Sequence, residues 1–95
     1  MTRTITISGD LDAARITAMR EEIDRVAAGD ADVTLDMTQC RFIDSSGVGA
    51  IVYLHKRMRA RGYRVSLSGL DGQPLKLLRH LGIAGLLATG DRSAA

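Results

Sequence analysis

Polar and hydrophobic residues alternate along three segments of the chain. Between residues 2 and 8, Thr and Ser alternate with Ile5 and Ile7, and the same period of two recurs over residues 31–37 and 63–67. Such alternation is typical of half-buried strands. We therefore expect three strands here, and a brief fourth strand over residues 86–89.

Three further segments have the three- and four-residue spacing of an amphipathic helix. The first begins at Asp12, a natural N-cap, and stops at Gly29. The second follows the turn residues 44–47 and ends at Gly62 with basic residues in its last turn. The third is short, and Pro74 occupies the position of its first helical residue.

Strands and helices thus alternate along the chain. This order predicts an α/β domain with a mainly parallel sheet of about four strands and about three packed helices. We expect residues 1–95 to form one domain. Loops at the carboxyl edge of such a sheet carry function, and two loops fall there, Gly9–Asp12 and Asp44–Gly47.

Composition narrows the class of protein. The chain has 95 residues, of which 45% are hydrophobic and 25% charged, as in an ordinary soluble domain. Cys40 is the single cysteine, so an internal disulfide is excluded and a reducing compartment is favoured. With two histidines besides, no metal site is expected, nor any cofactor. No stretch approaches the ~20 apolar residues needed to cross a bilayer, so we expect a cytoplasmic protein without membrane insertion.

Charge is distributed unevenly. Residues 1–36 carry eight acidic and four basic residues, whereas residues 37–95 carry three acidic and nine basic ones. Three explanations fit the basic stretch from Lys56 to Arg64: contact with phosphates, a solvated helix end, or steering toward an acidic partner protein. The chain has three aromatic residues and no Trp, which supplies few stacking platforms. We do not expect nucleic acid as a partner.

Residues 36–49 read DMTQCRFIDSSGVG, residues 9–12 read GDLD and residues 81–87 read LGIAGLL. In these three segments the sequence resembles the STAS domain family, and most closely its small bacterial anti-sigma-factor antagonists. The likeness covers residues 2–90. It implies a switch protein that binds an anti-sigma serine kinase of the GHKL type, is released when phosphorylated, and is reset by a PP2C-type phosphatase.

The resemblance also implies roles for individual residues. Ser45, directly after the motif aspartate, corresponds to the phosphorylated serine. The partner-binding residues would be Asp10, Asp12, Asp44, Ser45, Ser46 and Gly47. Two departures from the family are the lack of its usual additional N-terminal strand and of its C-terminal helix, which would leave a sheet edge or face open to self-association or strand addition.

Without the resemblance, the sequence allows two roles for Asp44 and Ser45. A serine at a helix start lies among free backbone N–H groups that can accommodate a phosphate, but Asp44 and Ser45 could equally well do no more than cap a helix. Cys40, near Phe42 and Ile43, is expected to be a buried structural residue.

Catalysis by this chain is disfavoured. His55 lies about 15 Å along the same helix from Ser45, too far to serve as its base, and His80 is expected to be a surface residue. No G-x-S-x-G elbow or lysine-bearing phosphate loop occurs. The remaining alternative is a non-phosphorylated STAS subunit of a membrane transport complex, including those that move lipids.

Overall fold

The computed structural model describes residues 1–83 and shows a parallel sheet with three helices. In chain order the elements are β1 (Thr2–Thr6), α1 (Ala13–Ala27), β2 (Asp32–Asp36), α2 (Ser45–Ala60), β3 (Val65–Ser68) and α3 (Gly72–His80). The strand order is β1-β2-β3, and both pairs are parallel. The expected α/β class is confirmed. The described residues hold three strands, and the expected fourth strand at 86–89 lies outside them.

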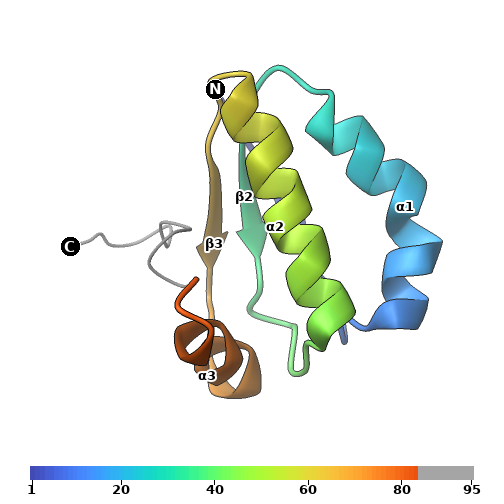
Figure 1. Cartoon of the computed structure of the whole chain (residues 1–95), viewed down its shortest axis with the longest axis vertical. Coiled ribbons are helices and arrows are strands. Elements are labelled where there is room, and N and C mark those ends of the chain that lie inside the picture. Colours follow the sequence, from blue (N-terminus) through green and yellow to red (C-terminus); the bar gives the residue numbers. More distant parts are fainter. Residues whose placement is uncertain (84–95) are drawn as a thin grey trace.

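The core lies between one face of the sheet and two helices. Val33, Leu35 and Leu67 alternate with more exposed polar residues on β2 and β3, and they pack with Ile51 and Leu54 of α2 in one buried cluster. Figure 1 shows α1 beside α2, with α3 below the tips of the strand arrows. Within the described part of the chain, no helix is long and apolar enough to span a membrane.

Each helix begins directly after an aspartate. Asp12, Asp44 and Asp71 are the N-caps of α1, α2 and α3. The expected start of α3, at Pro74, was therefore too late, and α2 begins within the turn residues 44–47. Helix α3 begins at Gly72, whose N–H donates to the Asp71 carboxylate at 2.8 Å, and Pro74 fits inside the first turn because no intrahelical N–H bond is required there.

Candidate functional site at the start of α2

The two loops singled out in the sequence lie side by side. Leu11 and Ile43 form an isolated parallel bridge, in which Leu11 N donates to Phe42 O at 2.9 Å and Asp44 N donates to Leu11 O at 3.4 Å. Both central residues are buried. Since the bridge is parallel, Asp12 lies level with Asp44, and the loop that opens α1 is attached to the loop that opens α2.

Asp44 caps both helices at once. One carboxylate oxygen accepts from Gly47 N at 3.0 Å in the first turn of α2, and the other accepts from Ala13 N at 3.2 Å at the start of α1. The positive ends of two helix dipoles therefore meet at one carboxylate. The structural role of Asp44 expected from a helix start is present, and it extends to a second helix.

The other two acidic residues of the predicted site differ from each other. Asp12 is half-buried and caps α1, accepting from Arg15 N at 2.9 Å. Asp10 is exposed, and the preceding Gly9 has φ +90°, a conformation that favours glycine. Asp10 is thus the acidic residue of this loop that is open to a partner.

Gly47 lies in contact with the loop Gly9–Asp12, the first of the two loops. It is buried on α2, and a Cβ at this position would overlap the Leu11 carbonyl oxygen and come within 2.6 Å of Ile43 Cγ1. The missing side chain is what lets α2 approach the first loop so closely. Its visible role is packing, and its assignment as a partner contact stays a prediction.

Ser45 is exposed as the first residue of α2. Its neighbour Ser46 is half-buried and lies at one end of a groove between α1 and α2. The groove is lined by residues of both helices: Ala13, Ile16, Thr17, Arg20, Ile23, Asp24, Ser46, Ala50 and Tyr53. Of the two serines, Ser45 is the more accessible to a modifying enzyme.

Gln73 was missed in the sequence. From the first turn of α3, its side-chain oxygen accepts from Ile43 N at 2.9 Å and its side-chain nitrogen donates to Ile43 O at 2.9 Å. The backbone N–H and C=O of the buried Ile43 are both satisfied by one side-chain amide. Gln73 therefore fixes the backbone immediately before Asp44, and no local pattern identifies a partner 30 residues away.

The segment between β2 and the site is also fixed in place. The Asp36 carboxylate accepts from the backbone and the hydroxyl of Thr38, at 3.0 and 2.7 Å, and these hydrogen bonds lower the pKa of Asp36. Cys40 is buried, as expected, and burial raises the pKa of its thiol. Both residues support the segment that leads to Ser45.

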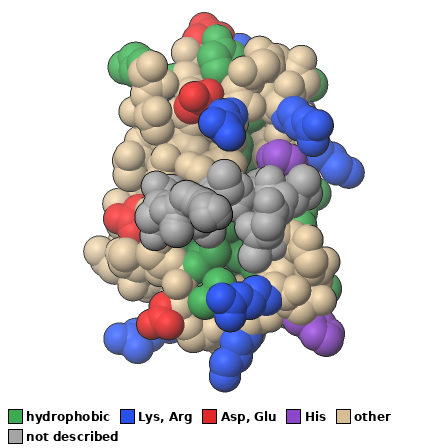
Figure 2. Space-filling view, turned by 90° about the vertical axis from the view of Figure 1, so that its left-hand side faces the viewer, with side chains coloured by type: hydrophobic (Ala, Val, Ile, Leu, Met, Phe, Trp, Pro, Cys, Tyr) green, Lys and Arg blue, Asp and Glu red, His purple; other side chains and the backbone are tan. Residues whose placement is uncertain are grey.

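The basic stretch begins at Lys56, about 17 Å along α2 from Ser45, and continues past the C-terminal end of the helix. Arg57 donates to the Tyr53 hydroxyl at 2.6 Å, and Arg61 binds the end of α1 and the α1–β2 connection. In Figure 2, Lys and Arg side chains are spread between the two ends of the visible face and form no single patch. A steering role for this stretch stays a prediction, and it would act from well beyond one Debye length, about 8 Å.

The two histidines lie outside the loop Asp44–Gly47, called here the serine loop. His55 is on α2 and His80 is the last residue of α3. Among residues 1–83, no group of three or more His, Cys, Asp or Glu side chains is placed to hold a metal ion.

The chain is a small parallel α/β domain with an exposed serine, Ser45, as the first residue of α2. The loop before this helix is hydrogen-bonded to the loop before α1. A family model described as "STAS domain" matches residues 2–94. The chain therefore belongs to the STAS domain family, and the resemblance inferred from its motifs is confirmed.

Two solved structures show the same fold. The sulfate transporter family protein from Wolinella succinogenes matches with a TM-score of 0.76 and 20% identity, over 92% of this chain and 71% of that chain. The anti-sigma factor antagonist SpoIIAA, in its unphosphorylated form, matches with a TM-score of 0.74 and 19% identity, over 97% of this chain and 81% of that chain. Comparison with curated protein sequences gave no match.

Proposed function

We propose that this protein is a cytoplasmic anti-anti-sigma factor. Unphosphorylated, it binds an anti-sigma serine kinase of the GHKL type, and phosphorylation of Ser45 releases it to control a sigma factor or another effector such as secretion. A PP2C-type phosphatase restores the binding form. The observation that carries this proposal is the exposed Ser45 at the first position of α2, directly after Asp44.

The effect of a phosphate at this position follows from the charges around it. Phosphorylation adds about −1.5 to −2 charge and three acceptor oxygens. Asp44 already occupies N–H groups at the starts of α1 and α2, and Asp12 lies level with it. A phosphate on Ser45 therefore adds charge to an acidic surface, which weakens binding to a partner surface that fits a neutral hydroxyl.

The chain acts here as the substrate and supplies no catalysis. ATP, magnesium and the base that accepts the serine proton come from the kinase, which transfers the terminal phosphoryl group of ATP to the Ser45 oxygen and releases ADP. Asp10, Asp12, Asp44, Ser45 and Ser46 would form the partner-binding surface, with Gly47 holding the loops beneath them.

The test is reaction with the cognate kinase and ATP, followed by intact-mass measurement and phosphopeptide mapping. We expect one phosphate on Ser45, loss of kinase binding after modification, and no modification of Ser45→Ala, which still binds. Ser46→Ala is the matched control and should be modified normally. Ser45→Asp should bind weakly, although its charge is smaller than that of phosphoserine.

A second candidate is a non-phosphorylated STAS subunit of a membrane transport complex, including one that moves lipids. The observation that favours it is the fold similarity to a sulfate transporter family protein. Phosphate on Ser46 with Ser45 unmodified would contradict the assignment of Ser45, and phosphate on neither serine would contradict the switch and favour this alternative.

A further inference from the structure

The outer side of β1 has free backbone groups. β1 lies at one end of the strand order, and Ile7 N donates to Asp36 O at 3.0 Å. Because backbone groups alternate in direction along a strand, those of Arg3 and Ile5 also point toward β2. The N–H and C=O groups of Thr2, Thr4 and Thr6 therefore point outward, and no strand within residues 1–83 pairs with them.

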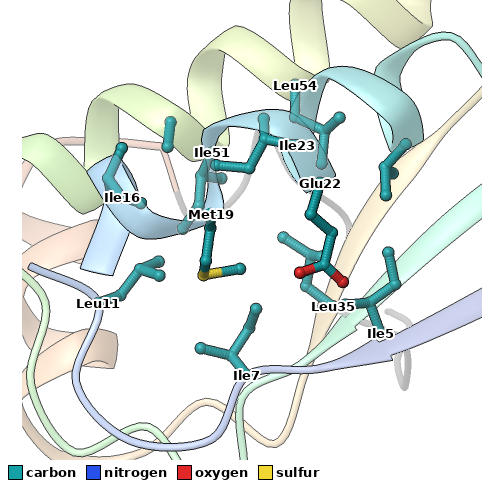
Figure 3. Close-up of a pocket in the computed structure, with 12 residues that line it drawn as sticks. Ile5, Ile7, Leu11, Ile16, Met19, Glu22, Ile23, Leu35, Ile51 and Leu54 are labelled. Carbon is teal, nitrogen blue, oxygen red and sulfur yellow. The ribbon is translucent and has the colours of Figure 1, made fainter. Parts of the chain in front are cut away.

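An apolar pocket of about 40 Å³ opens beside this edge, between α1, α2 and the sheet. Figure 3 shows Met19 and Ile23 of α1 above Ile5 and Ile7, with the Glu22 carboxylate at the same pocket. The lining residues are Ile5, Ile7, Leu11, Ile16, Met19, Glu22, Ile23, Val26, Leu35, Ala50, Ile51 and Leu54. Glu22 is the charged member of an otherwise apolar set.

Two residues of opposite charge, Arg3 and Glu22, lie near the outer side of β1 and form no ion pair with each other. Both are exposed, and within the described chain neither takes part in a salt bridge or a side-chain hydrogen bond. The Arg3 guanidinium lies near Gly29, where a Cβ would be 4.0 Å from Arg3 Nη1. Arg3 shares the helix-side face of β1 with Ile5, since side chains two residues apart point the same way. Ile5 in turn lines the pocket together with Glu22.

We propose that a second copy of this chain pairs antiparallel with β1, with the two-fold axis at Thr4. Thr4 then lies opposite Thr4 of the partner subunit, and Thr2 opposite Thr6 of the partner subunit. These are the residues whose backbone groups point outward, so they form the hydrogen-bonded pairs. Arg3 falls opposite Ile5 of the partner subunit in a non-hydrogen-bonded pair, where Cα atoms lie about 4.5 Å apart.

This register brings the unmatched charges together. Arg3 of the partner subunit reaches the side of Ile5 that adjoins Glu22, and symmetry creates the same contact twice. The aliphatic part of the arginine covers the mouth of the apolar pocket while its guanidinium meets the carboxylate. A second copy is favoured over another protein because both members of the charge pair are present in one chain, at positions that this register makes opposite.

The dimer would leave the serine loops free. Antiparallel pairing directs the carboxyl ends of the two sheets in opposite directions, so the two Ser45 sites lie at opposite ends of the assembly. The proposal is independent of the switch function, because it concerns the side of the sheet and not the loops at its end.

The test is sedimentation equilibrium of the full chain over a concentration series. We expect a monomer–dimer equilibrium for the wild type. Arg3→Glu and Glu22→Arg should each weaken dimerisation roughly tenfold or more, because each turns two attractions into repulsions. The double exchange, Arg3→Glu with Glu22→Arg, should restore it. Glu21→Arg makes the same change in charge at an exposed position outside the pocket and should leave the dimer intact.

Thr4→Pro provides a second test. It removes an N–H that the monomer does not use in its sheet, so the variant should fold, as checked by circular dichroism, and remain monomeric. A wild type that stays monomeric at every concentration would overturn the proposal. So would equal weakening by Glu21→Arg and Glu22→Arg, or a double exchange that does not recover dimerisation. Pairing with a strand of a different protein in place of a second copy would also overturn it.

Discussion

The two ends of the sheet are held together in different ways. At the carboxyl end, backbone meets backbone: Leu11 pairs with Ile43, Gly47 lies against the Leu11 carbonyl, and Gly69 lies against Thr38. At the amino end, Val33 N donates to Arg64 O at 2.8 Å between the starts of β2 and β3, and a long side chain connects α2 to the end of α1 and to the α1–β2 connection. Arg61, the C-cap of α2, donates to Ala27 O at 2.9 Å and Gly29 O at 2.7 Å, and contacts Asp30 at 2.6 Å.

The difference indicates which end of the sheet tolerates amino-acid substitutions better. A guanidinium on a flexible stem adjusts when its partners move, and its side chain is 36% exposed, so water can replace part of what it binds. Loops that touch through their backbones have no such freedom, because an added methyl group must displace another chain segment. The end that carries Ser45 is therefore expected to be the less tolerant one.

The largest expected effect is at Gly47. Gly47→Ala places a Cβ against Leu11 O and Ile43 Cγ1, and we expect a loss of about 2–3 kcal/mol in unfolding free energy, since overpacking outweighs the gain in helix propensity. Urea denaturation measures it.

Gly49→Ala is the matched control for Gly47→Ala. It lies on the same helix, and none of residues 1–83 has an atom within 4 Å of the added Cβ. The substitution should stabilise the protein by about 0.5–1 kcal/mol. Equal changes in unfolding free energy for Gly47→Ala and Gly49→Ala would show that the loop at Leu11 can move away from α2 at little cost.

Gln73→Leu should have the next largest effect. It leaves the backbone N–H and C=O of the buried Ile43 without their partner, which costs about 1–3 kcal/mol. Thermal unfolding compares it with Lys76→Leu, an exposed position on the same helix. Hydrogen exchange at Ile43 N–H should also become faster in Gln73→Leu. An unchanged exchange rate there would mean that Gln73 does not hold this backbone.

Arg61→Ala tests the amino end. Three hydrogen bonds and the stacking on Tyr63, with 5.4 Å between guanidinium carbon and ring centroid, are lost. Because the site is partly exposed, we expect about 1 kcal/mol. Arg59→Ala, at an exposed position on the same helix, should be near neutral. A loss for Arg61→Ala larger than that for Gly47→Ala would reverse the comparison between the two ends.

The smallest effect concerns Cys40, in the segment between β2 and the serine loop. Because burial raises the pKa of its thiol above the ordinary value, the reactive thiolate is scarce near neutral pH and increases only as pH rises through that raised pKa. Alkylation of the folded protein should therefore be slow compared with the urea-unfolded chain, followed by mass spectrometry. Equal rates would contradict the buried position. Cys40→Ala should leave partner binding nearly intact.

Local patterns were sufficient to predict the order of elements, because alternation, helical spacing and capping aspartates act over a few residues. The position of Ser45 at a helix start followed from Asp44 in the same way. The contacts of Gln73 with Ile43, of Asp44 with Ala13 and of Arg61 with Ala27 each join residues about 30 positions apart. Such contacts depend on how the elements pack, and side-chain periodicity carries no information about them.

The double capping by Asp44 has a spectroscopic consequence. The amide N–H of Ala13 donates to the carboxylate of Asp44, the residue next to Ser45, although Ala13 and Asp44 are 31 residues apart in the chain. A change in the charge or orientation of that carboxylate alters the shielding of the Ala13 proton. The Ala13 cross-peak in a nitrogen–proton correlation spectrum is thus a reporter on Ser45. It can be observed in the isotope-enriched native sequence, with no probe attached to the loop that carries Ser45.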